Sequence, residues 1–234
     1  MVQFLLTSNV TFTGIALRYD SYERTFMDFE QIEYQFTQKW FYQCGAADTW
    51  ARIESVRAAR SFLEIGSFEG ASVCWMIENS LVEEIMCIDT WEGGHEHKNK
   101  NLQMSEIEKR FDRNVKIAID RVSRDVHLIK QKSLSFNALA QMIAQGGKDI
   151  FDVIYIDGSH RPRDVISDAV LAFELLTPNG ILIFDDYCWT DKTTNDGIRS
   201  SPKLAIDAFT TCFFDEISFV NAPVSQIIIK KFKE

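Results

Sequence analysis

Short apolar runs alternate with amphipathic stretches along the chain after residue 60. Runs such as FDVIYI (151–156) and ILIF (181–184) predict strands that are buried on both faces. The stretches between them carry apolar residues at steps of three and four, which predicts helices. The predicted strands are residues 61–65, 84–88, 126–129, 151–156, 181–184, 216–220 and 226–230. The predicted helices are residues 71–78, 102–122, 133–144, 163–176 and 201–213.

This alternation predicts an α/β fold: a Rossmann-like, doubly wound, mostly parallel seven-stranded sheet with helices on both faces. The last two strands are joined through Asn221-Ala222-Pro223, a connection too short for a crossover helix. We therefore expect a C-terminal antiparallel hairpin. A nicotinamide-binding Rossmann domain normally continues in parallel units instead.

The chain changes character near residue 60. The preceding stretch is rich in aromatic residues, and Phe26, Phe29, Phe36 and Trp40 recur at helical steps. It predicts one or two helices outside the sheet, so we divide the chain into an N-terminal helical extension or lid (1–60) and a main domain (61–234). The aromatic side chains indicate either a lid and substrate wall or ordinary helix packing, including a contact within a homodimer.

Composition narrows the class of partner. The 234 residues suit one α/β domain, and a net charge of −9 disfavours nucleic acid or an anionic membrane as the main partner. No apolar run is long enough to span a membrane, and the N-terminus does not resemble a signal peptide. Five cysteines, none in a C-x-x-C pair, indicate reduced thiols. We expect a cytoplasmic protein whose partner is a small molecule.

The first candidate site follows the strand at 61–65, in the sequence EIGSFEG. Gly66 allows a sharp turn, and Gly70 allows the next helix to begin close to a ligand, where a side chain would fill ligand space. The N-terminus of that helix favours an anion. The motif lacks the middle glycine of G-x-G-x-x-G, which brings the backbone close to a pyrophosphate. It therefore disfavours NAD.

Asp89 ends the second predicted strand, 23 residues after Gly66. An acid about 20 residues beyond the glycine turn accepts hydrogen bonds from ribose hydroxyls in nucleoside-binding units. Asp89 therefore predicts a nucleoside without specifying which one.

Acidic residues gather after the fourth and fifth strands, which we expect to be neighbours. Asp157 and His160 follow one strand, and Asp185 and Asp186 follow the other. Two roles are open. The acids bind a divalent metal that activates an acceptor hydroxyl, or Asp157 or His160 acts directly as the general base. His95 and His97 form a His-x-His pair without an evident third ligand, and we interpret them as part of a loop at the entrance.

Four motifs in this order, LEIGSFEG, CIDTWEGG, FDVIYIDGSH and ILIFDDY, resemble the class I S-adenosylmethionine-dependent methyltransferases. Within that class the chain is most similar to the methyltransferase-24 type group, over about residues 60–230. The resemblance implies methyl transfer from S-adenosylmethionine to a small-molecule or sugar hydroxyl. It implies that the following residues contact the cofactor: Glu64, Gly66, Ser67, Gly70, Asp89, Thr90, Trp91, Ser133 and Asp157.

The layout is also similar to metal-dependent O-methyltransferases, which implies a Mg²⁺ site formed by Asp157, Asp185 and Asp186. The histidine at 160 is a departure from that pattern, and related sequences that carry it need not bind metal. From its position alone, Ser133 is as readily an N-cap for the helix at 133–144.

Two other functions remain open: an NAD-dependent oxidoreductase, and a non-catalytic nucleoside-binding module whose partner surface is the aromatic extension. Neither the acceptor nor the oligomeric state can be read from the sequence.

Overall fold

The structure is a computed structural model that describes residues 34–94, 102–192 and 196–232. The described residues from Gln35 to Phe232 belong to one compact unit. Most of the predicted extension, with Phe26 and Phe29, lies outside the described residues, as do His95 and His97.

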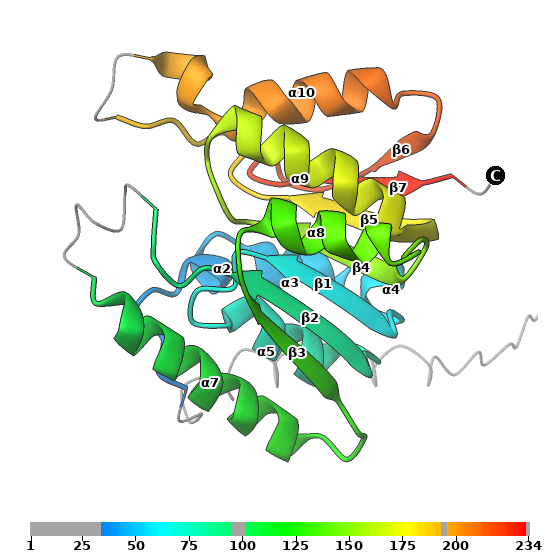
Figure 1. Cartoon of the computed structure of the whole chain (residues 1–234). Helices are drawn as coiled ribbons and strands as arrows, with labels where there is room; N and C mark the ends of the chain where they lie inside the picture. Colours follow the sequence, from blue (N-terminus) through cyan, green and yellow to red (C-terminus); the bar gives the residue numbers. More distant parts are fainter. Residues whose placement is uncertain (1–33, 95–101, 193–195, 233–234) are drawn as a thin grey trace, which may run out of the picture. The chain divides into compact units, whose positions relative to one another are not determined.

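One seven-stranded sheet runs through the unit, in the order β3-β2-β1-β4-β5-β7-β6 (Figure 1). Strands β1 to β5 pair in parallel, whereas β7 pairs antiparallel with both β5 and β6. The predicted α/β sheet with a C-terminal antiparallel hairpin is confirmed. The strands are β1 (Ser61–Ile65), β2 (Glu84–Asp89), β3 (His127–Lys132), β4 (Phe151–Ile156), β5 (Leu176–Phe184), β6 (Ile217–Val220) and β7 (Ile227–Lys231).

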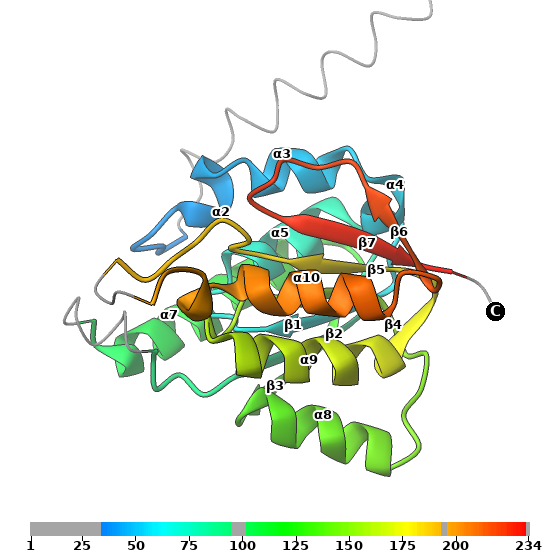
Figure 2. The ribbon, with the colours of Figure 1, turned by 90° about the horizontal axis from the view of Figure 1, so that it is seen from above.

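Helices cover both faces of the sheet. Helices α8, α9 and α10 pack in a row on one face, and α5 packs against α7 and α3 on the other (Figures 1 and 2). The helices are α2 (Trp40–Gln43), α3 (Ala46–Ala51), α4 (Glu54–Arg57), α5 (Ala71–Asn79), α7 (Met104–Arg121), α8 (Ser135–Ala144), α9 (Pro162–Leu175), the 3-10 helix η2 (Gly197–Ser200) and α10 (Pro202–Cys212).

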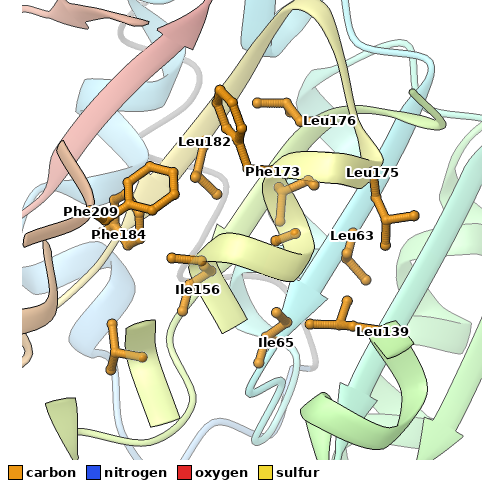
Figure 3. Packing of buried hydrophobic residues seen from close by; sticks show 14 of the residues in the cluster. Leu63, Ile65, Leu139, Ile156, Phe173, Leu175, Leu176, Leu182, Phe184 and Phe209 are labelled. Atoms are coloured by element: carbon orange, nitrogen blue, oxygen red, sulfur yellow. The ribbon is translucent and has the colours of Figure 1, made fainter. Parts of the chain in front are cut away.

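One cluster of the hydrophobic core lies between the sheet and the row of α8, α9 and α10. Figure 3 shows Leu63 of β1, Ile156 of β4 and Leu182 of β5 packed with Phe173 of α9 and Phe209 of α10. All five side chains are buried. This core fixes β1, β4 and β5 in register, and so it fixes the positions at which those strands end.

Two sequence expectations about element ends are wrong. β3 extends to Lys132, because its pairing with β2 continues to Asp89. Consequently α8 begins at Ser135 with Leu134 as its N-cap, and Ser133 is not the cap.

The sequence Pro178-Asn179-Gly180 does not separate α9 from β5. It lies inside β5, where the pairing with β4 shifts register between Phe151 and Val153. Asn179 has a φ of +65°, a conformation that asparagine tolerates better than most residues. The helix therefore ends at Leu175, and the strand follows immediately.

The described part of the aromatic stretch forms three short helices, α2 to α4, rather than one or two. The rings of Phe41 and Trp50 pack edge to face, with their centres 4.9 Å apart. Trp50 packs in the same way on Tyr155 of β4, with a distance of 4.8 Å between the ring centres. These rings belong to the core of the unit that begins at residue 35. A lid role for residues 1–60 stays a prediction.

The structure bears on the cysteines and on membrane-spanning segments. None of the five cysteines, all of which lie among the described residues, forms a disulfide. Among the described helices, none is both long enough and apolar enough to cross a membrane.

Candidate active site

A cleft of about 1250 Å³ opens at the carboxyl ends of β1, β2, β4 and β5. Ligands bind at this edge of open α/β sheets. Nine of the predicted site residues line the cleft: Gly66, Ser67, Asp89, Thr90, Ser133, Asp157, His160, Asp185 and Asp186. The other three predicted residues, Glu64, Gly70 and Trp91, do not line the cleft.

The glycine turn after β1 is shaped by contacts with the protein itself. Gly66 has a φ of +90°, and a Cβ there would lie 2.2 Å from the backbone oxygen of Asp157. Gly70 has a φ of +80°, and its Cβ would lie 3.0 Å from the ring of Phe111. In the structure, the glycines allow the turns after β1 and β4 to lie close together and α5 to begin against α7. Whether a side chain at either position also fills cofactor space stays a prediction.

Asp89 holds the same turn from the end of β2. Its Oδ2 accepts hydrogen bonds from the backbone N–H groups of Ser67 and Phe68, both at 2.9 Å, and its Oδ1 accepts one from Trp91 at 2.8 Å. Two carboxylate oxygens offer about four acceptor positions. Asp89 therefore organises the turn and still retains capacity for a hydroxyl in the cleft.

Trp91 and Thr90 follow Asp89. The Trp91 indole donates to the Phe68 carbonyl at 3.0 Å, and the Lys130 ammonium lies 4.6 Å from the ring centre. Trp91 thus holds the glycine turn through the Phe68 carbonyl, whereas Thr90 lines the cleft. Ser133 also faces the cleft, and its hydroxyl donates to the Leu134 carbonyl at 3.1 Å.

Glu64 is fully buried beneath the turn. Its Oε1 accepts a hydrogen bond from the Ser72 hydroxyl, while its Oε2 and the nearby Ser67 Oγ have no hydrogen-bond partner. Burial raises the pKa of Glu64 to about 7 against the opposing effects of the Ser72 and Ser67 hydroxyls. Two buried polar atoms without partners, one of them on a cleft residue, indicate a place where a polar ligand group completes the hydrogen bonding.

The acids after β4 and β5 converge as predicted. The Tyr155 hydroxyl lies 3.1 Å from Asp157 Oδ2 and makes a second hydrogen bond with Asp185 Oδ2. Gln226 donates to the same Asp185 oxygen at 3.1 Å, and Trp50 donates to Gln226 at 3.0 Å. A buried hydrogen-bonded chain therefore extends from the aromatic core to the two carboxylates.

Burial raises the pKa of Asp157 well above its usual range, and the charges of Asp185 and Asp186 add to this effect. Burial also raises the pKa of Asp185, with Asp186 as the next cause. Like charges packed this closely share protons or attract a cation.

His160 pairs with Asp186 across the two turns. Its Nε2 lies 2.6 Å from Asp186 Oδ2, and its ring stacks on Trp189 at 4.2 Å. Asp186 has a φ of +58°, so its backbone adopts a conformation that is uncommon outside glycine in order to present the carboxylate.

Ligand-type atoms of Asp157, His160 and Asp186 lie within 4.8 Å of one another. This set differs from the predicted trio, since it holds His160 in place of Asp185. Both oxygens of Asp185 accept hydrogen bonds, from Tyr155, Gln226 and the Asp186 N–H.

Sequence reasoning missed Tyr155, Gln226 and Trp189. Tyr155 lies in an apolar strand and was interpreted only as core, and Gln226 begins an isoleucine run. A polar side chain at the start of an otherwise apolar strand was the available signal for Gln226. Trp189 carries no pattern, because its role depends on a loop conformation.

Comparison with known proteins places the chain in context. The model of a methyltransferase domain family matches residues 63–187, which is more than half of the chain. An uncharacterized protein of Acanthamoeba polyphaga mimivirus is 27% identical over 129 residues, a stretch that covers 54% of this chain and 51% of the viral protein. The chain therefore spans about half the length of this curated relative.

Two solved structures share the fold across nearly the whole chain. An O-methyltransferase from Bacillus cereus, in complex with SAH, has a TM-score of 0.57 and 15% identity, covering 95% of this chain and 93% of its own. The O-methyltransferase TomG from Streptomyces achromogenes, involved in tomaymycin synthesis and in complex with SAM, has a TM-score of 0.57 and 14% identity, covering 92% and 89%.

Proposed function

The chain belongs to the methyltransferase-24 type family of methyltransferase domains, and on this premise we propose that it transfers the methyl group of S-adenosylmethionine to a hydroxyl oxygen of a small-molecule acceptor. The observation that carries the proposal is the juxtaposition of two features in one cleft. The glycine turn of β1 lies against the β4 turn, which bears Asp157 and His160.

The residues of the turn fit this cofactor. Helix α5 begins at Ala71, and its N-cap Gly70 has no side chain to cap it, so its first N–H groups are available to a carboxylate. Glu64 Oε2 and Ser67 Oγ offer buried acceptors and a donor beneath it. Asp89 is positioned for ribose hydroxyls, and Thr90 and Ser133 face the same cleft.

S-adenosylmethionine supplies an electrophilic methyl group when it is bound. The chain's own contribution is to position an acceptor hydroxyl and to remove its proton, and positioning provides much of the rate gain in such displacements. Either Asp157 or His160 removes the single proton of the hydroxyl. If His160 is the base, Asp186, which is 2.6 Å from His160 Nε2, stabilises the imidazolium that forms.

The alternative role for the cluster is metal binding, and it uses the same atoms. Asp157, His160 and Asp186 provide two carboxylates and one imidazole. Mg²⁺ prefers oxygen ligands only, whereas divalent transition metals accept imidazole nitrogen. The set therefore suits a cation such as Mn²⁺ better than Mg²⁺. A cation on these atoms would replace the His160–Asp186 hydrogen bond, so the two roles exclude each other.

A turnover assay tests the function. The protein is incubated with S-adenosylmethionine and a panel of alcohols, phenols, sugars and amines, and the S-adenosylhomocysteine formed is measured. Turnover with hydroxyl compounds supports the proposal. Turnover confined to amines contradicts the acceptor class. Tight cofactor binding without turnover on any compound would support the non-catalytic module. In a separate assay that contains NADH instead of S-adenosylmethionine, oxidation of NADH would support the oxidoreductase. The cytoplasmic location and the homodimer stay predictions.

A further inference from the structure

Two buried polar side chains hold the backbone of residues 35–37. Glu69, in the glycine turn, is 2% exposed. Its Oε2 accepts a hydrogen bond from the Thr37 N–H at 2.6 Å, and its Oε1 accepts one from the Thr37 hydroxyl at 2.8 Å. One carboxylate thus binds the same residue twice.

Asn114 of α7 is fully buried and makes a parallel attachment. Its Oδ1 accepts from the Gln35 N–H at 2.8 Å, and its Nδ2 donates to the Gln35 carbonyl at 3.3 Å. The same Nδ2 donates to the Glu69 backbone carbonyl at 2.9 Å. Asn114 therefore connects the segment to the turn as well as to α7.

Arg110 completes the arrangement. Its guanidinium lies 3.0 Å from Glu69 Oε1 and is 31% exposed. A buried carboxylate is costly unless it is paired and hydrogen-bonded, and here it has one ion pair and two further donors. This arrangement favours an acid, because the Thr37 N–H and the Arg110 guanidinium can only donate.

The segment held in this way forms one wall of the cleft. Residues 35–41 are called the wall segment below, and four of them line the cleft: Phe36, Gln38, Trp40 and Phe41. The Trp40 ring lies 5.8 Å from the ring of Phe68, which is also in the glycine turn. The turn itself is held by Asp89 through the N–H groups of Ser67 and Phe68.

We infer that Glu69 is a positioning residue that joins the wall segment to the cofactor turn, so that cofactor binding and the ordering of this wall depend on each other. The inference rests on the proposed function. Ser67 and Phe68 are directly followed by Glu69, so a ligand that orders the turn also orders the carboxylate that holds Thr37. By linkage, a wall that is already ordered strengthens cofactor binding by the same factor.

The test compares wild-type protein with Glu69→Gln and Thr37→Val. Gln places an NH₂ group against donors, whereas Val removes one hydroxyl and leaves the buried carboxylate intact. Glu106→Gln, an exposed acid on α7 paired with Lys109, is the matched control. Amide hydrogen exchange of residues 35–41 is measured with and without S-adenosylhomocysteine, together with its affinity by titration calorimetry.

We expect the ligand to slow exchange of the wall segment in wild-type protein and in the control. In Glu69→Gln we expect faster exchange and an affinity weaker by about tenfold, within the usual range of coupling between sites. Thr37→Val should show the same changes with smaller amplitude. If the variants bind the ligand as tightly as wild type, Glu69 holds the segment without coupling and the inference is wrong. If wild-type protein does not bind the ligand, the proposed function itself fails.

Discussion

The imidazole of His160 and the carboxylate of Asp186 lie 2.6 Å apart, although the two residues are 26 positions apart and follow different strands. The parallel pairing of β4 with β5 brings their ends together, and Trp189 stacks on the outer face of the imidazole. The pair thus has the geometry of a base that is oriented and stabilised by an acid.

Replacement of His160 by Gln should lower kcat by roughly 10²–10⁴-fold, the usual contribution of a positioned base. Affinity for S-adenosylhomocysteine should change little, because His160 does not hold the glycine turn. Steady-state kinetics and titration calorimetry on the same preparation measure both. Asp186→Asn should produce a smaller loss. Unchanged turnover in His160→Gln would remove this residue from the mechanism.

Chelation distinguishes the base from the metal site. Because His160 and Asp186 are hydrogen-bonded to each other in the base role, we expect turnover to be unaffected by EDTA and by added Mg²⁺. The measurement is the initial rate before and after chelation, followed by addition of Mg²⁺ or Mn²⁺. Loss of activity that Mn²⁺ restores would contradict the base role and assign Asp157, His160 and Asp186 to a cation.

Glu64 should make the stability of the protein depend on pH. Burial raises its folded-state pKa from 4.5 to about 7, so the folded state binds the proton more tightly than the unfolded chain does. The resulting stabilisation is fully present below about pH 4.5 and is lost as the pH rises through 7. At about 1.4 kcal/mol per pKa unit, the loss is at most about 3.5 kcal/mol.

Glu64→Gln should therefore be more stable than wild type at pH 8 and similar to it at pH 4.5. Urea unfolding at the two pH values measures the difference. A stability gap that does not change with pH would show that Glu64 does not titrate in this range.

The two glycines Gly66 and Gly45 provide a matched pair. Both have positive φ, but a Cβ at Gly45 meets nothing within 4 Å. Gly45→Ala should cost only the left-handed conformation, about 1–2 kcal/mol. Gly66→Ala should add an overpacking cost of about 1–3 kcal/mol or more, because the Cβ overlaps the Asp157 carbonyl. Equal losses in thermal unfolding would refute the close crossing of the two turns.

The fold could be predicted from the sequence because it depends on periodicity. The apolar runs at 151–156 and 181–184 are strands in which every residue but Asp152 is buried, and the short link after residue 220 permits only a hairpin. Element ends were less predictable. Ser133 is a residue type that is common at N-caps. However, β3 stays paired with β2 up to Lys132, so the helix begins only at Ser135.

The candidate site was predictable to the level of strand ends. Asp157, His160, Asp185 and Asp186 converge because β4 and β5 are neighbours. Which acid pairs with which partner depends on side-chain geometry: Asp185 turns towards Tyr155 and Gln226, and Asp186 turns towards His160. The hydrogen bonds between Glu69 and Thr37 join residues that are 32 positions apart, so no local sequence pattern predicts them.

Calorimetric titration of wild-type protein with S-adenosylhomocysteine, alongside NAD as a comparison, tests the central claim most directly. The account predicts saturable binding of S-adenosylhomocysteine in the micromolar range and no binding of NAD under the same conditions. Well-folded protein that binds NAD and not S-adenosylhomocysteine would contradict it.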